Sequence, residues 1–180
     1  MKFNPLPLNG AYEVQLEPRW DARGFFARTF CHHEFGALGL NTNWTQMNMS
    51  RTQNAGTLRG LHFQHAPHAE IKLVRCLRGR AYDVIVDLRA GSGTFGQHFG
   101  LELDARTGNA IYIPQGFAHG FQTLTPETEL QYMHSADYAP DHEGGVNLMD
   151  PELAIAWPRP PGTLSDRDVS LPFLRDIKPL

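Results

Sequence analysis

Short runs of alternating apolar and polar residues, separated by turn sequences, recur along most of this chain. In the run 81–89, apolar side chains occupy every second position from Tyr82 to Leu88, and the same period appears at residues 44–50, 98–103 and 111–113. Because successive side chains of a strand point to opposite faces, this period predicts β-strands. Turn sequences separate the runs at residues 78–80, 90–93, 106–109, 140–141 and 143–145. Short strands at this spacing predict an all-β sandwich or barrel rather than a parallel sheet.

Helical signals are few. Residues 32–39 predict one short helix, and the tail from Asp150 to Leu180, with its six prolines, predicts a surface segment with a helical turn or two. The chain has 180 residues, of which 41% are apolar, and it contains no internal repeat or convincing linker. This length suits a single domain with its own core. We therefore predict one domain spanning residues 1–180.

Charge and hydropathy exclude several classes of function. The net charge is −3, so the chain has no overall positive field that would attract nucleic acid. No apolar run approaches the ~20 residues that a membrane-spanning helix needs. Residues 1–5 begin no targeting segment of the usual kind. These features predict a cytoplasmic protein with no nucleic-acid or membrane partner.

The segment Leu58–Gln64 carries the strongest chemical signal. It contains Arg59 and His62, and Lys72 follows shortly after it. A base and two cations this close together suggest proton removal from an anionic, carbonyl-bearing substrate. Strand parity places Gly60, His62 and Gln64 on one face of their strand, and Leu130, Tyr132 and His134 on one face of another. If the barrel interior is the site, His62 and Tyr132 both point inward, whereas Arg59 points outward unless a bulge at Gly60 turns it.

Nine histidines invite a metal hypothesis. Residues 108–119 match the second motif of the cupin family almost position for position, and this resemblance implies a cupin-type jelly roll, or double-stranded β-helix. The first cupin motif requires His-x-His, but Gln64 stands at the second His position and Glu70 falls late. A transition-metal site needs three or four good ligands. We therefore predict no metal and no cofactor. The remaining histidines are interpreted as surface or unassigned residues: His32, His33, His65, His68, His98, His134 and His142.

Many segments in order support a family resemblance. The chain resembles the dTDP-4-dehydrorhamnose 3,5-epimerases, which are nucleotide-sugar epimerases with a metal-free cupin fold, from about Phe3 to about Pro172. The segments that carry the resemblance are 21–26, 46–50, 58–64, 72–75, 83–89, 94–96, 114–121, 132–140, 150–151, 155–158 and 164–168. A proton is removed beside the ketone of a 4-keto sugar in this family and is returned on the opposite face.

The resemblance implies a role for each catalytic residue. His62 matches the base and Asp168 the carboxylate that orients it, while His119 lies where the family has a second, supporting histidine. Lys72 matches the cation beside the developing enolate oxygen. Tyr132 matches the acid on the far face. Imidazole and carboxylate suit this chemistry because their pairing fixes the tautomer and raises the basicity of the ring.

The resemblance also implies the binding residues and a homodimer. Arg59 and Arg23 match positions that bind the diphosphate. The N-terminal strand of the family crosses to the other subunit, so Arg23 is expected to serve that subunit's site. Phe26 of the same segment is also predicted to contact substrate. Further predicted substrate contacts, around the nucleoside, are Arg28, Gln46, Asn48 and Tyr138. Arg28 departs from the family, which commonly has Glu there. This departure leaves the nucleotide base open.

We therefore predict an isomerase that acts at C3, C5 or both carbons of a nucleotide-linked 4-keto-6-deoxy sugar, with dTDP-4-dehydro-6-deoxyglucose as the leading candidate. Its product would feed rhamnose or another deoxysugar of a polysaccharide or metabolite. The first alternative is the same chemistry on a CDP-, GDP- or UDP-linked sugar. A metal-dependent cupin enzyme is a second alternative, against which Gln64 argues. A non-catalytic sugar-nucleotide-binding module is a third, against which the intact His62, Lys72, Tyr132 and Asp168 argue.

Overall fold

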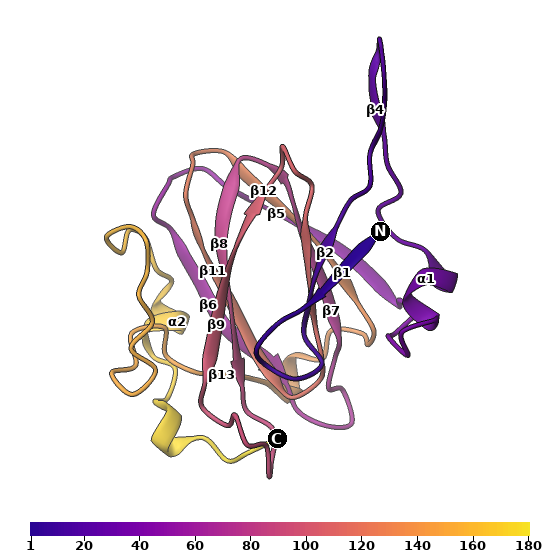
Figure 1. Cartoon of the computed structure of the whole chain (residues 1–180). Helices are drawn as coiled ribbons and strands as arrows, with labels where there is room; N and C mark the ends of the chain where they lie inside the picture. Colours follow the sequence, from indigo (N-terminus) through magenta and orange to yellow (C-terminus); the bar gives the residue numbers. More distant parts are fainter.

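Two antiparallel sheets face each other and make up most of the molecule (Figure 1). The structure is a computed structural model and describes residues 1–180. Along the first sheet the order is β1 (Lys2–Pro5), β2 (Tyr12–Gln15), β10 (Ala110–Ile113), β7 (Lys72–Arg78), β12 (Thr128–His134) and β5 (Gln46–Thr52). Along the second it is β13 (Glu143–Gly145), β6 (Leu58–Gln64), β11 (Phe117–Thr123), β8 (Arg80–Asp87) and β9 (His98–Asp104). The predicted all-β jelly roll is confirmed.

The core lies between the two sheets. Val74 and Leu130 of the first sheet and Ile85 and Phe121 of the second belong to one buried cluster. Fully burying an apolar side chain of this size stabilises the fold by ~1.5–3 kcal/mol. The alternation seen in the sequence supplies this inner core in β9 and β10, through Leu103, Ile111 and Ile113.

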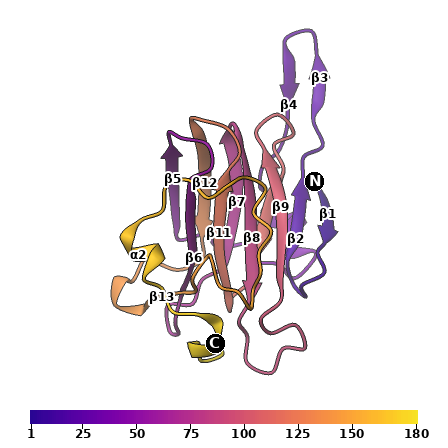
Figure 2. The ribbon, with the colours of Figure 1, turned by 90° about the vertical axis from the view of Figure 1, so that its left-hand side faces the viewer.

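The tail covers the outer face of the second sheet. Val84 and Val86 of β8 point away from the inner core and pack in a second cluster with Trp157 and Leu164. Asp83, on the other face of β8, has no solvent exposure, so both faces of this strand are covered. The tail contains α2 (Asp166–Val169) and η2 (Leu174–Asp176), and Figure 2 shows it wrapped along the sheet, as predicted.

Two further short helices complete the secondary structure. The predicted helix at residues 32–39 is present as α1 (His32–Gly36), and η1 (Pro140–His142) precedes β13. None of the helices has both the length and the apolar character of a membrane span.

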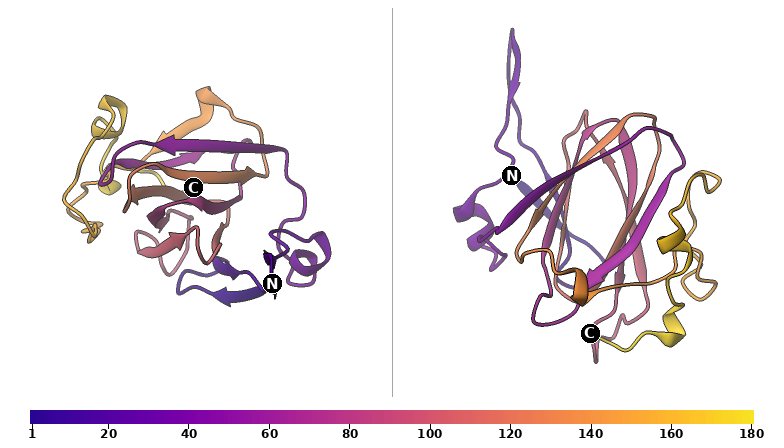
Figure 3. Two further views of the ribbon diagram at one scale, coloured as in Figure 1. Left: turned by 90° about the horizontal axis from the view of Figure 1, so that it is seen from above. Right: turned by 180° about the vertical axis from the view of Figure 1, so that it is seen from behind.

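A separate hairpin projects from the body of the molecule. It consists of β3 (Arg19–Asp21) and β4 (Gly24–Phe26), and Figure 3 shows it extending beyond the sheets on the side away from the tail. Its three large side chains are exposed: Trp20 is 70%, Phe25 51% and Phe26 77% accessible. An isolated two-stranded hairpin is marginally stable in water, so these aromatic residues leave much apolar area without a partner in the chain.

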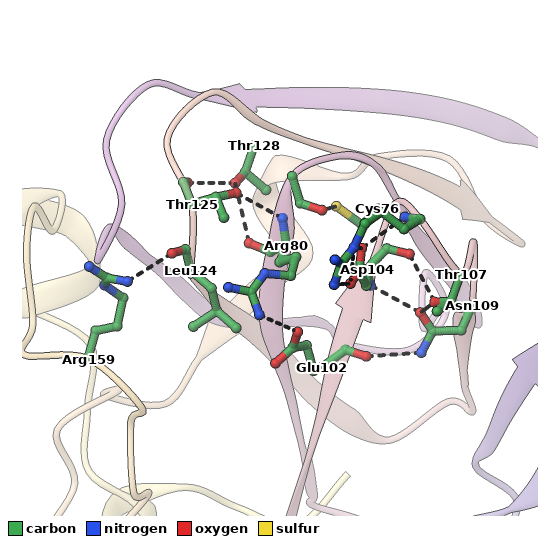
Figure 4. A network of polar contacts seen from close by, with 12 residues as sticks. Cys76, Arg80, Glu102, Asp104, Thr107, Asn109, Leu124, Thr125, Thr128 and Arg159 are labelled. Carbon is green, nitrogen blue, oxygen red and sulfur yellow. Dashed lines mark hydrogen bonds and ion pairs between the residues drawn. The ribbon is translucent and has the colours of Figure 1, made fainter.

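Polar contacts tie together the turns at one end of the barrel (Figure 4). The backbone N–H of Arg80 donates to Thr125 Oγ1 at 2.9 Å, and the Arg80 guanidinium donates to Glu102 at 2.9 Å. Asn109 donates to the carbonyl of Glu102 and accepts from the backbone N–H of Asp104. These contacts tie the start of β8 and the end of β9 to the turns that follow β9 and β11.

Candidate active site

A cavity of about 580 Å³ opens between the two sheets. Side chains from β5, β6, β7, β11 and β12 line it, together with residues of the tail. Nine of the twelve predicted site residues lie in its wall: His62, Tyr132, Asp168, Lys72, His119, Arg59, Gln46, Asn48 and Tyr138. The cavity therefore brings together side chains that are up to 122 positions apart in the sequence, from Gln46 to Asp168.

His62 and Asp168 form a hydrogen-bonded pair in one wall. His62 Nε2 lies 2.7 Å from Asp168 Oδ1, and Asp168 is 4% exposed. Helix α2 presents this carboxylate because Ser165 caps the helix, accepting the backbone N–H of Asp168 at 3.1 Å. A carboxylate that accepts from Nε2–H leaves Nδ1 as the unprotonated nitrogen. Burial lowers the pKa of His62, and the bond with Asp168 opposes that shift.

A bulge places Arg59 beside His62 in the same wall. On β6 two residues separate Arg59 from His62, whereas on β11 only Gly120 separates their partners, Phe121 and His119. The extra residue reverses the expected parity, so Arg59 lines the cavity rather than pointing away from it. The outward placement that strand parity predicts for Arg59 is therefore wrong. The stated exception, a bulge at Gly60, is present in the structure.

Glycine is required at the bulge. Gly60 has a φ of +124°, and a Cβ built there would lie 2.5 Å from the Cα of Gly120. Both the backbone conformation and the close approach exclude a side chain.

Tyr132 occupies the opposite wall, on β12. Its hydroxyl lies 2.8 Å from Ser50 Oγ, and its ring packs against the inner core. Burial raises the pKa of the Tyr132 phenol well above its usual value, so the group keeps its proton throughout the neutral range. Tyr132 and His62 thus both point inward, as predicted.

His119 lies in the same wall as His62, in register with it on the neighbouring strand β11, and its partner was not foreseen. His119 Nε2 lies 2.8 Å from Asp83 Oδ2, and the two side chains are 6% and 0% exposed. Complete burial raises the pKa of Asp83, while His119 opposes the rise. The His119 ring centroid is 6.3 Å from that of Tyr132.

Lys72 belongs to a second unforeseen network. Its Nζ lies 3.0 Å from Glu70 Oε1, and Glu70 Oε2 lies 2.6 Å from His134 Nδ1. Burial disfavours the charged carboxylate, but His134 and Lys72 together hold the pKa of Glu70 below its usual value. Strand parity predicted that His134 shares a face with Tyr132. It did not predict the partner of His134, because Glu70 lies 64 residues away in the sequence.

Polar residues surround the mouth of the cavity. Gln46 Nε2 donates to Asn48 Oδ1, and Gln46 Oε1 accepts the backbone N–H of Tyr138 at 3.1 Å. The Tyr138 hydroxyl donates to Glu143, which also pairs with Arg167 at 2.8 Å. Tyr138 is 57% exposed, so its ring is free to stack on a planar ligand.

Three of the predicted substrate contacts lie outside the cavity. Arg23 and Phe26 are on the projecting hairpin, where Arg23 pairs with Asp21 at 2.6 Å. Arg28 pairs with Glu34 at 2.9 Å beside α1. Within a single chain these three residues do not meet the other nine, so their contacts with substrate remain predictions that need a second subunit.

Gln64, at the metal-motif position, has a structural environment of its own. It is 4% exposed, donates to the carbonyls of His68 and Asp137, and accepts from the backbone N–H of Ala139. It therefore ties the two loops at the cavity rim together. No group of three or more His, Cys, Asp or Glu side chains is arranged to hold a metal ion.

Comparison with known proteins gives a consistent result. The sequence model of the dTDP-4-dehydrorhamnose 3,5-epimerase family matches residues 5–176. A curated dTDP-4-dehydrorhamnose 3,5-epimerase from Mycobacterium tuberculosis is 38% identical over 182 residues, covering 99% of this chain and 90% of that protein. A dTDP-4-dehydrorhamnose 3-epimerase from Streptomyces niveus is 40% identical, covering 99% and 86%. A crystal structure of the 3,5-epimerase from Bacillus anthracis with TDP and pyrophosphate bound superposes with a TM-score of 0.93, at 41% identity and with 96% and 98% of the chains covered.

Proposed function

The chain belongs to the dTDP-4-dehydrorhamnose 3,5-epimerase family, and on that premise we propose that it inverts C3, C5 or both carbons of dTDP-4-dehydro-6-deoxyglucose. It is thus a carbohydrate epimerase, an isomerase. One observation carries the proposal: a histidine paired with a carboxylate and a protonated phenol stand on opposite walls of one cavity, on β6 and β12. That arrangement suits a reaction that takes a proton from one face of a ring and returns it to the other.

The first step uses His62 and Lys72. Carbons C3 and C5 flank the C4 ketone, so removal of a proton from either one moves its bonding electrons onto the ketone oxygen. His62 Nδ1 accepts the proton, and Asp168 stabilises the imidazolium through Nε2–H. Lys72 supplies the positive charge beside the enolate oxygen.

The second step uses Tyr132. The enolate collapses to the ketone while the same carbon takes the phenolic proton from the other side of the ring, which inverts the centre. The phenolate is then reprotonated and His62 releases its proton, so the enzyme returns to its starting state. His119 and its partner Asp83 hold the space beside Tyr132 and support its ring position.

The nucleotide occupies the mouth of the cavity. Arg59, turned inward by the bulge, binds the diphosphate because its planar guanidinium matches pairs of phosphate oxygens. Gln46 and Asn48 contact the nucleoside, and the exposed ring of Tyr138 stacks on the base.

A second copy of the chain completes the site in this proposal. Arg23 and Phe26 lie on the projecting hairpin and line no part of their own chain's cavity, and the exposed aromatic side chains of the hairpin favour burial against another protein surface. Arg28 would then lie beside the partner's nucleoside and influence which base is accepted.

The test is proton exchange on defined donors. The protein is incubated in D₂O with 4-keto-6-deoxyglucose carried on TDP, CDP, UDP or GDP, and NMR follows deuterium at C3 and C5. We expect exchange with inversion on the TDP sugar, unaffected by a chelator. Absence of exchange on all four donors would refute the function and leave a binding module. Exchange only on another donor would show that this chain prefers a different nucleotide. The Arg28→Glu variant would then test whether Arg28 sets that preference.

A further inference from the structure

Three histidines that line the cavity are each paired with a carboxylate, and the proposed reaction uses only two of these pairs. His62–Asp168 supplies the base, and His119–Asp83 supports the Tyr132 ring. The third pair, His134–Glu70, has the shortest contact of the three at 2.6 Å, and both of its side chains line the same cavity. It has no role in the mechanism above.

His134 has the bonding pattern of an acid–base group. Its Nδ1 is engaged by Glu70, while Nε2 makes no hydrogen bond within the chain, so the free nitrogen is left for a ligand. The His134 and Glu70 side chains are only 13% and 10% exposed. Glu70 remains ionised because His134 and Lys72 outweigh the effect of its burial on its pKa. An ionised carboxylate at Nδ1 stabilises the imidazolium, as Asp168 does for His62.

His134 also lies in the wall that holds the acid. It is two residues after Tyr132 on β12 and therefore on the same face, and the two rings stack with centroids 6.1 Å apart. Across the sheet, His134 pairs in register with Lys72. His62, on β6 in the other sheet, faces this wall. His134 Nε2 is therefore placed on the side of the cavity opposite the base.

We propose that His134, backed by Glu70, is a second catalytic acid on the Tyr132 wall, so that each of the two carbons beside the ketone has its own proton donor. The inference rests on the proposed epimerase function and deepens it. A substrate held by its ketone oxygen at Lys72 presents its two neighbouring carbons at different points along β12. Tyr132, whose hydroxyl is tied to Ser50, serves one of them, and His134 serves the other.

The step at the second carbon is balanced in protons and charge. His62 Nδ1 takes the carbon-bound proton, and the electron pair moves onto the ketone oxygen. The enolate then collapses as the carbon bonds to the proton of His134 Nε2–H, leaving a neutral imidazole. Water returns a proton to His134 and removes one from His62, so nothing is consumed.

The decisive variant is His134→Asn. The asparagine amide is able to keep a hydrogen bond to Glu70, and hence the setting of Lys72, but it cannot deliver a proton. Epimerisation of dTDP-4-dehydro-6-deoxyglucose is followed by NMR in D₂O, carbon by carbon. We expect inversion at one carbon to fall by ~10²-fold or more, while deuterium still enters there through His62 and inversion at the other carbon continues. In Tyr132→Phe the affected carbon should be the other one.

Controls separate this result from damage to the fold. His98→Asn changes a strand histidine of β9 outside the cavity and should retain wild-type inversion at both carbons. Thermal unfolding and TDP binding of His134→Asn should match those of the wild type. His134→Gln, which places its amide farther along the same direction, should reproduce the selective loss.

Several outcomes would overturn the proposal. Equal loss at both carbons would assign His134 a merely structural part, and retention at both would assign it none. A wild-type enzyme that inverts only one carbon would leave no reaction for a second acid. If the wild-type protein exchanges no proton on any donor, the epimerase function itself fails, and that result is distinguishable because it requires no variant.

Discussion

Replacement of Asp168 by Asn tests the pairing on which the base depends. The substitution keeps the size of a side chain that is 4% exposed, but it removes the charge that lies 2.7 Å from His62 Nε2. The asparagine amide N–H can also donate to His62 Nε2. Such a bond favours the tautomer with the proton on Nδ1, which leaves Nδ1 unable to accept a proton from the substrate. The base would then be both weaker and misoriented.

The expected loss follows from the geometry. Two unit charges ~4 Å apart interact by ~4 kcal/mol at an effective dielectric constant of ~20. That interaction develops when His62 becomes the imidazolium, so most of it is lost from the transition state. A barrier increase of ~3–5 kcal/mol lowers kcat by ~10²–10⁴-fold, which is also the usual contribution of a positioned base.

The pH profile gives a second, independent signature. Burial lowers the pKa of His62, and Asp168 opposes that shift. The acid limb of kcat/KM in the wild type therefore lies below the ordinary histidine value, because the free enzyme must hold His62 unprotonated. Removal of the opposing charge moves this limb to still lower pH, while the plateau falls. General damage to the fold lowers the plateau without moving the limb.

The assay is NMR epimerisation in D₂O across the acidic range, with Asp166→Asn as the matched control. Asp166 lies on α2 two residues earlier and is exposed, so its replacement should leave the acid limb unchanged. The role of Asp168 as the partner of the base would be contradicted if kcat of the Asp168→Asn variant stayed within ~10-fold of wild type, or if its acid limb did not move.

Three further predictions concern other parts of the same machinery. Tyr132→Phe should slow inversion at the carbon that Tyr132 serves by ~10²–10⁴-fold in the NMR assay, and wild-type rates at both carbons would remove the phenol from the mechanism. Lys72→Met, which keeps the length but not the charge, should lower kcat by ~10²–10³-fold with little change in KM; a change in KM alone would restrict Lys72 to binding. Gly60→Ala should cost at least ~2 kcal/mol in thermal unfolding because the added Cβ meets Gly120, whereas Gly91→Ala, with a φ of +71° in open space, should cost only ~1–2 kcal/mol. Equal costs would refute the steric argument.

The fold was predictable because its signals are local. The two-residue period gave the strands around Val84 and Leu101, and the turn residues between them limited the architecture to a sandwich or barrel. His62 and Tyr132 also point inward as predicted, since that prediction needed only the assumption that the site lies inside the barrel. These predictions depend only on neighbours along the chain.

The carboxylate partners were not predictable in the same way. No role was predicted for Asp83 from the sequence, and Glu70 was considered only as a late-falling residue of the cupin metal motif. The bonds that they form with His119 and His134 join segments that only the completed sheets bring together. Asp168 was assigned through the family resemblance, and the structure brings it to His62 across 106 positions. Such pairings depend on which strands become neighbours in the sheets. The two-residue alternation along a single strand carries no information about that order.

The bulge at Gly60 shows why fold and chemistry cannot be separated in this site. Arg59 and His62 are three positions apart, and on a regular strand an odd separation places two side chains on opposite faces. Both must face the cavity if one is to bind the diphosphate and the other is to take the proton. The extra residue on β6 makes this possible, and it needs Gly60 against Gly120 because neither side of the contact has room for a Cβ. The sequence Arg-Gly-x-His is thus a structural unit that brings an anion-binding group and a base to one surface. With a regular β6, only one of Arg59 and His62 would face the cavity.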